Sequence, residues 1–341
     1  MMFFLTTFFL ILIFFFTNNY IKKFNYLPNY KGQKHQKFSG LKNIQLSGGI
    51  FLTLASVFLF YNYNPLFSLF ILLMFVVGFI SDINFLSSPK IRLLIQSILV
   101  FFFVFLLDIK IYSTRFILLD LLLENIYFKY FFSAFCLLIL INGSNFIDGL
   151  DGLNLGYFFL IIVIILYLNS QDLIEVDEKK IVVIFHIVSF LLLLNIFNYL
   201  YLGDSGSYLI GFIFGTFLID LSYNNYSLSP YFVTLLLWYP AFENLFSIIR
   251  KRLIKENPFE PDNHHFHQLL FNFLKKKENN FIKRFSNILS SALIVFYNLI
   301  IFFIGSNFTN HTKILLSLLL VNIIVYLVLY IVLKKKSSKC H

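Results

Sequence analysis

Four short polar segments interrupt an otherwise apolar sequence, and each carries side chains that could act on phosphate groups. The segments are 78–82, 142–152, 203–207 and 261–267. Their candidate catalytic or metal-binding carboxylates are Asp82, Asp148, Asp151 and Asp204. Carboxylate oxygens suit Mg²⁺, which usually keeps several waters and bridges to substrate phosphates. Four carboxylates in one place repel one another unless a cation or bound protons compensate, so a shared site predicts a hard divalent cation.

The segment 142–152 has the most regular spacing. Asp148 and Asp151 are three residues apart, which puts both carboxylates on one face if a helix begins there. Asn142 and Asn145 have the same spacing and would extend a polar stripe into an apolar helix, where polar groups are costly and usually functional. The alternative is that Asp148 only caps the following helix, and the spacing leaves both interpretations open.

The carboxylates on either side are weaker signals. Residues 203–207 read Gly-Asp-Ser-Gly-Ser, typical of a turn with Ser or Asp as a helix N-cap. Such a helix start would also offer free amide donors to an anion. Asp82 follows an apolar run and could equally be an interfacial anchor.

Three histidines form the last polar segment. His264, His265 and His267 could coordinate zinc, but no Cys lies nearby and the spacing fits no closed structural site. A solvated loop is the simplest alternative. We favour phosphate contact, because the basic run 250–255 raises the local positive potential. Glu243 and Asp220 are interpreted as packing or interface residues outside the site.

The elements that position these residues must be membrane helices. Of the 341 residues, 59% are hydrophobic and 13% are charged, whereas soluble proteins have about 45–50% apolar and about 25% charged residues. This excludes a water-soluble domain, a disordered chain and a disulfide scaffold. A spanning helix needs about 20 mostly apolar residues. We predict an all-α polytopic membrane protein with about eleven spans, near 3–20, 46–62, 66–81, 92–108, 127–142, 153–168, 181–200, 206–221, 230–248, 288–305 and 313–333.

The placement of Lys and Arg predicts the orientation of the spans. Most of the 27 basic residues fall in connections after odd-numbered spans and in the C-terminal tail. This predicts an N-terminus outside and a C-terminus in the cytoplasm, with all four polar segments on the cytoplasmic side. The orientation of the spans then explains the net charge of +10, and no nucleic-acid partner is needed to account for it. We expect one membrane domain, 1–341, with 249–287 as a cytoplasmic loop and 109–126 as a re-entrant or interfacial piece.

These residues resemble the polyprenyl-phosphate N-acetylhexosamine-1-phosphate transferases, of the glycosyltransferase family 4 type. The resemblance runs from about residue 20 to residue 270, with the segments in the family's order. Asn142-x-x-Asn145-x-x-Asp148-Gly-x-Asp151-Gly is the most specific, followed by Gly203-Asp204-x-Gly206-Ser207. The histidine segment is more similar to the branch that starts O-antigen and enterobacterial common antigen than to the phospho-MurNAc-pentapeptide translocase branch, whose loop has consecutive histidines.

Two positions depart from the family pattern. The family usually has paired aspartates after its third helix, whereas Ser81 takes the first place here and only Asp82 remains. The approach to Gly48 and Gly49, basic and proline-containing in the family, has no proline here. The first departure argues against a mechanism that needs the missing carboxylate as base or nucleophile.

The resemblance implies that undecaprenyl phosphate attacks the β-phosphorus of a UDP-N-acetylhexosamine, releasing UMP and forming a lipid diphosphate sugar. Phosphate monoesters have a second pKa of about 6, so the acceptor is largely dianionic near neutral pH and the loss at Ser81 is tolerable. Bringing two anions together is harder, because phosphoryl transfer depends on positioning and charge neutralisation.

The resemblance also implies roles for the site residues. Asp204 binds Mg²⁺, or Mn²⁺ in its place, and Asp148 or Asp151 assists. Asp82 orients or activates the lipid phosphate. The expected substrate contacts are Asn145 to the nucleotide and His265 and His267 to the diphosphate, with Asn142, His264 and Lys37 as further substrate-binding candidates.

The expected location is the bacterial cytoplasmic membrane, with the site facing the cytoplasm and a homodimer left open. One rival is a secondary transporter, but transporters usually have repeats with broken helices at the bilayer midplane, and no repeat is visible. Other rivals are a catalytically silent scaffold and a sibling reaction with UDP-MurNAc-pentapeptide. The hexosamine, the glycan and the choice between direct displacement and a covalent intermediate stay open.

Overall fold

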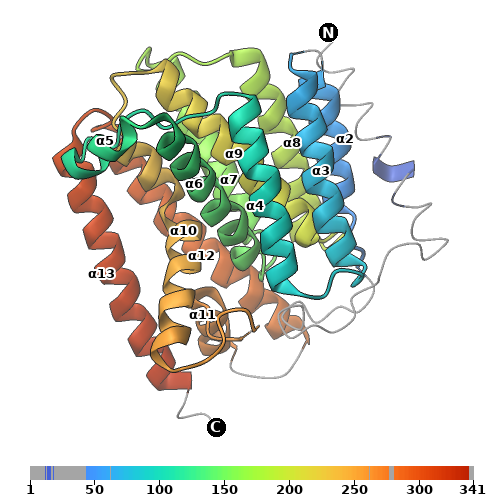
Figure 1. Ribbon diagram of the computed structural model, residues 1–341. Helices are drawn as coiled ribbons and strands as arrows, with labels where there is room; N and C mark the ends of the chain where they lie inside the picture. Colours follow the sequence, from blue (N-terminus) through green and yellow to red (C-terminus); the bar gives the residue numbers. More distant parts are fainter. Residues whose placement is uncertain are drawn as a thin grey trace.

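A computed structural model describes residues 12, 14–16, 18, 44–61, 63–260, 262–275 and 280–337. The described chain is built from helices (Figure 1). They are α2 (Gly48–Tyr61), α3 (Pro65–Asp82), α4 (Pro89–Leu106), α5 (Ile117–Leu123), α6 (Ile126–Ile147), α7 (Leu153–Ser170), α8 (Glu178–Ile196), α9 (Gly203–Asn224), α10 (Pro230–Leu253), α11 (Phe266–Leu274), α12 (Asn280–Ser306) and α13 (Thr312–Ser337).

Nine of the described helices are long and apolar enough to cross a membrane, and α2 is a shorter apolar helix. Each predicted span from residue 46 onward coincides with one of these ten helices. The predicted span 3–20 lies almost wholly outside the described residues. Large apolar side chains such as Phe101, Phe131 and Phe296 are exposed on the bundle surface, as expected where lipid replaces water around the protein.

The helices alternate in direction, so their ends form two groups (Figure 1). The C-terminal ends of α3, α6 and α10 lie at the lower end of Figure 1, together with the N-terminal ends of α4, α7 and α9. We call this the lower end; the C-terminal end of α13 is also there. All four polar segments belong to connections or helix ends of this group, so the fold brings together residues more than a hundred positions apart.

Helix α9 lies at the centre of the bundle. In the part of α9 suited to span a membrane, 78% of the residues are buried, and α9 packs against α2, α3 and α6. A helix that is apolar on all sides is stable only when other helices surround it. The first turn of α9, which carries Asp204, therefore has a fixed position relative to the ends of α3 and α6.

Two regions differ from, or refine, the sequence predictions. The region 109–126 contains only the short helix α5, at the end of the bundle opposite the lower end (Figure 1). The connection 249–287 is largely helical, because α10 continues to Leu253, α11 covers Phe266–Leu274 and α12 already begins at Asn280. The apolar pattern underestimated α10 and α12 because their ends are polar, and helices can extend beyond a membrane core without losing backbone hydrogen bonds.

Candidate active site

Asp82, the last residue of α3, binds the beginning of α9. Its Oδ1 accepts the amide of Asp204 at 2.8 Å, and its Oδ2 accepts the amide of Ser205 at 3.1 Å and the hydroxyl of Ser205 at 2.6 Å. The first amides of a helix have no partner within the helix, and a carboxylate there is favoured by the helix dipole. The anion expected at these amides is thus Asp82 itself, and neither Ser205 nor Asp204 is the N-cap of α9.

Two glycines allow this approach of α3 to α9. A Cβ at Gly78 would lie 2.3 Å from the Cα of Ser205, so any larger residue would push the helices apart. Gly203 has a φ of +73°, which disfavours side chains, and a Cβ there would lie 2.8 Å from Asp82 Oδ2. Small residues at helix crossings are a common means of close packing in membranes. Here they fix the distance between Asp82 and Asp204.

Asp204 forms an ion pair with Arg92, a residue of the first turn of α4. Arg92 Nη1 donates to Asp204 Oδ2 at 2.6 Å and lies 2.5 Å from Ser81 Oγ, and Ser81 Oγ donates to the same Oδ2 at 2.5 Å. Arg92 Nε is buried with no hydrogen-bond partner among the described residues. The side chains of Arg92 and Asp204 are 21% and 25% exposed, so a ligand can reach this pair.

The turn between α6 and α7 carries the next two carboxylates. Asp148 is the C-cap residue of α6, and α7 begins after Gly152, whose φ is +78°. Neither alternative from the sequence is correct: the residues 148–152 form a turn rather than one helix face, and Asp148 does not cap α7. The amide of Asp151 donates to Asn287 Oδ1 at 2.9 Å, and that of Gly152 to Asn195 Oδ1 at 2.6 Å.

The carboxylates of this turn are in an environment that disfavours charge. Burial raises the pKa of Asp151 to about 7, although the Arg284 charge opposes this. Burial also raises the pKa of Asp148 well above its usual range, and the negative charges of Asp204, Asp82 and Asp151 raise it further. Each carboxylate thus lies within electrostatic reach of another, which is the repulsion expected from the sequence if the segments meet.

The two asparagines of α6 have different surroundings. Asn145 Oδ1 accepts the hydroxyl of Ser207 at 2.9 Å, which connects α6 to the first turns of α9. Asn142 donates to Gln96 Oε1 of α4 at 3.2 Å and to the carbonyl of Leu138 at 3.0 Å. Both asparagines are partly exposed, but Asn142 lies one helical turn farther from the lower end than Asn145.

The histidine segment folds over the lower end of α10. His264 is exposed, whereas His265 and His267 are buried. His265 Nδ1 lies 2.9 Å from Glu243 Oε1, and its Nε2 lies 3.5 Å from Asp262 Oδ1. His267 stacks on His265 at a centroid distance of 5.7 Å. Lys37, the last predicted substrate contact, lies outside the described residues.

Three residues at these positions were not predicted from the sequence as part of the site. They are Arg92, Glu243 and Asn287. Arg92 could have been predicted, because a basic residue at the start of α4 is close in sequence to Asp82 and could be the counter-charge of a carboxylate in the site. Glu243 is a carboxylate inside an apolar span, which is itself a signal of function. Asn287 gives no such signal, since polar residues are frequent in α12.

The arrangement can be tested against the chemistry of Mg²⁺. No group of three His, Cys, Asp or Glu side chains is placed to hold a metal within the described part of the chain. Mg²⁺ often takes one or two protein carboxylates and completes its coordination with water and substrate phosphates. The mutual repulsion of Asp148 with Asp82 and Asp204 would be relieved by such a cation. The donor set therefore fits Mg²⁺ held jointly with a substrate, and does not form a closed protein cage.

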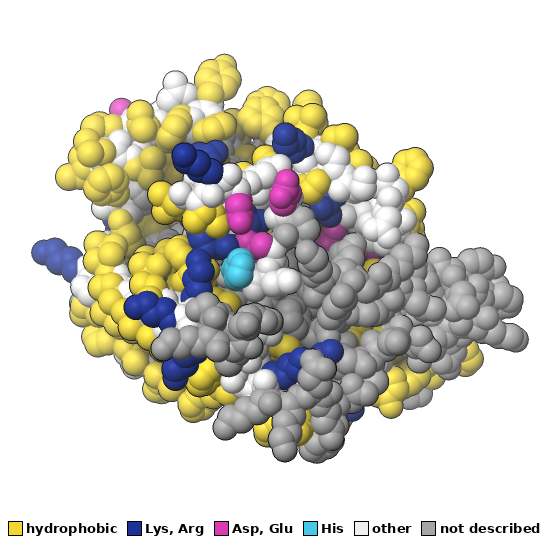
Figure 2. All heavy atoms as spheres, turned by 90° about the horizontal axis from the view of Figure 1, so that it is seen from below, with side chains coloured by type: hydrophobic (Ala, Val, Ile, Leu, Met, Phe, Trp, Pro, Cys, Tyr) yellow, Lys and Arg dark blue, Asp and Glu magenta, His cyan; other side chains and the backbone are white. Residues whose placement is uncertain are grey.

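The surface of the lower end combines both signs of charge. Figure 2 shows acidic side chains close to a histidine, with Lys and Arg side chains around them. Described basic residues at this end include Lys90, Arg250, Arg252, Lys275 and Lys334. An acidic centre with a basic surround suits an anionic ligand that arrives together with a divalent cation.

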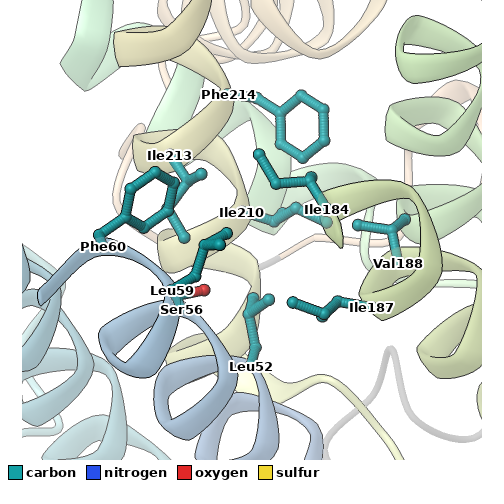
Figure 3. Close-up of a pocket in the computed structure, with 10 residues that line it drawn as sticks. All are labelled: Leu52, Ser56, Leu59, Phe60, Ile184, Ile187, Val188, Ile210, Ile213 and Phe214. Atoms are coloured by element: carbon teal, nitrogen blue, oxygen red, sulfur yellow. The ribbon is translucent and has the colours of Figure 1, made fainter. Parts of the chain in front are cut away.

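A separate apolar cavity lies between α2, α8 and α9. It is lined by Leu52, Ser56, Leu59, Phe60, Ile184, Ile187, Val188, Ile210, Ile213 and Phe214 (Figure 3). Ser56 is the one lining residue with a polar side chain. The cavity lies along the bundle rather than at the carboxylates, so it contributes no group that could act on a phosphate.

Comparisons with known proteins show what this chain is similar to. Residues 64–222 match the family model for Glycosyl transferase family 4. The undecaprenyl-phosphate alpha-N-acetylglucosaminyl 1-phosphate transferase of Thermotoga maritima is 28% identical over 227 residues. That alignment covers 64% of this chain and 65% of the relative, so the chain spans just under two thirds of the relative's length. Over the helices that carry Asp82, Arg92, Asp148 and Asp204, this chain is thus similar to glycosyl transferase family 4.

Proposed function

We propose that this protein transfers a HexNAc 1-phosphate from a UDP-sugar to undecaprenyl phosphate and releases UMP. The observation that carries the proposal is the meeting of four carboxylates and Arg92 at one end of an apolar helical bundle. An acceptor with an apolar chain and a charged head can present its phosphate at such a place. A water-soluble donor can reach the same residues from the solvent side.

The described contacts indicate how the charges would be balanced. The guanidinium of Arg92 can form two parallel hydrogen bonds to a phosphate, and one of its nitrogens has no partner among the described residues. We propose that Arg92 neutralises a substrate phosphate. Asp82 has both carboxylate oxygens occupied by α9, so we propose that it fixes the position of Asp204 and does not act directly on the lipid phosphate.

The carboxylates fit a role in metal binding. Asp204 and Asp148 would hold Mg²⁺, with Mn²⁺ as a substitute; when bound, the ion supplies charge neutralisation between the two phosphate substrates. Asp151 would keep the turn 148–152 in place, together with Asn287 and Asn195. Asn145, one turn from Asp148, and the exposed His264 are the proposed contacts to the nucleotide and the diphosphate.

The positions of Lys and Arg residues support a proposal for the side of the membrane that the site faces. Runs of Lys and Arg at the end of α10 and at the end of α13 are at the lower end, and such residues are enriched on the cytoplasmic side of membranes. We therefore propose that the lower end faces the cytoplasm of a bacterial cell, where UDP-sugars are made.

The donor that we propose to test first is UDP-GlcNAc, because the similar Thermotoga maritima protein is named for N-acetylglucosaminyl 1-phosphate transfer. The product would begin a lipid-linked glycan such as O-antigen or another surface polysaccharide. UDP-MurNAc-pentapeptide serves as the competing donor in the experiment.

The test is a transfer assay with membranes that contain the full chain. Radiolabelled UDP-GlcNAc is added with undecaprenyl phosphate and Mg²⁺, and label is measured in the organic phase. The proposal predicts a lipid product that disappears when a chelator is present or undecaprenyl phosphate is left out. Label that stays in the aqueous phase for every UDP-HexNAc offered would contradict the proposal, and label only from UDP-MurNAc-pentapeptide would assign the sibling reaction.

A further inference from the structure

Glu243 is a carboxylate in the middle of an apolar helix and is 1% exposed. It lies in α10, which is one of the helices suited to span a membrane. Placing a charge there is costly unless other groups pair with it. The contacts of Glu243 should therefore indicate the role of this buried carboxylate.

Both oxygens of Glu243 are occupied, each by a different part of the chain. Oε1 lies 2.9 Å from His265 Nδ1 and accepts the amide of Phe266 at 3.2 Å. Oε2 accepts the hydroxyl of Tyr326 in α13 at 2.8 Å. Glu243 thus connects the histidine segment to α10 and α13. It also accepts the amide of Phe266, the first residue of α11.

The other side of His265 faces a second carboxylate. His265 Nε2 lies 3.5 Å from Asp262 Oδ1, and Asp262 is paired with Arg250 at 2.5 Å and with Lys251 at 3.6 Å. The two carboxylates on opposite sides of the ring therefore fix the orientation of His265.

His265 in turn contacts the residues that reach the carboxylate cluster. Its ring lies parallel to that of His267 at 5.7 Å and 5.1 Å from the ring of Phe146 near the end of α6. A Cβ on Gly149 would be 2.5 Å from His267 Nε2, so His267 is packed directly on the turn that follows Asp148. A displacement of the His265 ring would be transmitted to that turn through His267.

We infer that Glu243 is a positioning residue, which acts through His265 to hold the histidine segment against the turn 148–152. It touches no substrate in this arrangement. The inference rests on the proposed function, because the histidine segment is the part of the site proposed to meet the diphosphate of the donor. Glu243 should therefore affect the use of the UDP-sugar and leave the use of the lipid phosphate unchanged.

The kinetic test compares Glu243→Gln with His265→Gln and with the double variant in purified full-length protein. Glutamine keeps the size of Glu243 and can still accept from Phe266, but it carries no charge to hold the ring. We expect each single variant to raise KM for the UDP-sugar and to lower kcat/KM by about tenfold to a hundredfold, the range for a misplaced binding group. KM for undecaprenyl phosphate should not change.

The double variant separates positioning from an independent role. If Glu243 acts through His265, the double variant should be no worse than the poorer single variant, because groups that act as a unit are not additive. Glu178→Gln, a matched change at an exposed residue of α8, should retain wild-type kinetics. Additive losses, or wild-type kinetics in Glu243→Gln, would overturn the inference.

A second measurement needs no turnover. Hydrogen exchange is followed in peptides that cover residues 262–275 in wild type and in Glu243→Ala. Loss of the acceptor for the Phe266 amide should speed exchange at the start of α11, and unchanged exchange would overturn the inference. The two proposals can fail separately. If Glu243→Ala exchanges faster but the wild-type protein makes no lipid product, the proposed function and the role of Glu243 in transfer are contradicted. Glu243 would then only anchor the histidine segment.

Discussion

Asp204 is held by one cation, Arg92, and one hydroxyl, that of Ser81. Ser81 and Arg92 both donate to Asp204 Oδ2, so this carboxylate is neutralised within the protein before any ligand binds. An aspartate at position 81, the usual residue in the family that the sequence resembles, would add a second negative charge beside Asp204. With Ser81 in that place, Arg92 pairs with the carboxylate of Asp204 and donates to a neutral hydroxyl.

We expect Asp204→Asn to abolish transfer and to leave the protein folded in the membrane. The amide keeps the shape of the side chain, but its neutral oxygen binds Mg²⁺ and Arg92 far more weakly. The measurement is lipid-product formation together with the melting temperature of the purified protein. Asp172→Asn, at an exposed turn residue between α7 and α8, is the matched control. An Asp204→Asn variant with wild-type activity would remove the metal role.

Asp262 provides a prediction of pH dependence. Burial alone would raise its pKa, but His265, Arg250 and Lys251 together hold the pKa of Asp262 below its usual value. A lowered pKa adds stability above the ordinary value of about 4, and this stability is lost as the pH falls through the folded-state pKa. Asp262→Asn should therefore lower the melting temperature at pH 7.

The same variant should differ less from wild type as the pH falls below the ordinary aspartate pKa of about 4, because protonation then removes the charge of Asp262 in wild type as well. Thermal denaturation in detergent at pH 7 and at decreasing pH measures the difference. A difference that widens on acidification would show that the network does not stabilise the charged form.

At the scale of elements, the crossing of α3 and α9 determines the geometry of the carboxylates. We expect Gly78→Ala to destabilise the protein by about 1–3 kcal/mol, the usual cost of overpacking, because its Cβ would meet backbone atoms of Ser205. The added methyl group would also separate Asp82 from the α9 amides, so transfer should fall more than stability suggests.

Gly156→Ala in α7 is the control for this prediction, since a Cβ there would meet the side chain of Val295 at 3.3 Å rather than backbone. Melting temperature and kcat/KM are measured for both variants. Equal effects of the two substitutions would show that the α3–α9 crossing has no special role.

The elements themselves were predictable to different degrees. The helices α2, α3, α4, α6–α10, α12 and α13 follow from apolar runs, because lipid leaves the backbone no other means of satisfying its hydrogen bonds. The ends of α10 and α12 and the whole of α11 were not predicted, since polar helices outside the membrane have no such constraint. The cap of α9 was also missed, because its acceptor, Asp82, is far away in the sequence.

The same distinction holds within the site. The motif spacing pointed to Asp82, Asp148, Asp151 and Asp204, and the structure brings their segments to one end of the bundle. The partners of these residues could not be read from spacing: Arg92 is paired across 112 residues with Asp204, and Asp151 across 136 residues with Asn287. Such pairs are set by helix packing, which no local pattern encodes.

At the scale of the whole molecule, the proposed function requires the lower end to face the cytoplasm. In a chain with Cys136 and Cys340 replaced by serine, single cysteines are placed at Asn263 in the histidine segment and at Asn307 between α12 and α13. A membrane-impermeant maleimide should label Asn307→Cys in intact cells and Asn263→Cys only after permeabilisation. The reverse pattern would place the carboxylates outside the cell and exclude cytosolic UDP-sugars as donors.

The most direct measurement is the stoichiometry of products formed by the purified protein in liposomes with UDP-GlcNAc, undecaprenyl phosphate and Mg²⁺. Mass spectrometry identifies both the lipid and the nucleotide released. We predict one undecaprenyl diphosphate sugar for each UMP, and neither product with Asp204→Asn. Release of UDP with a lipid monophosphate sugar, or no lipid product from any UDP-HexNAc, would contradict sugar-1-phosphate transfer at this site.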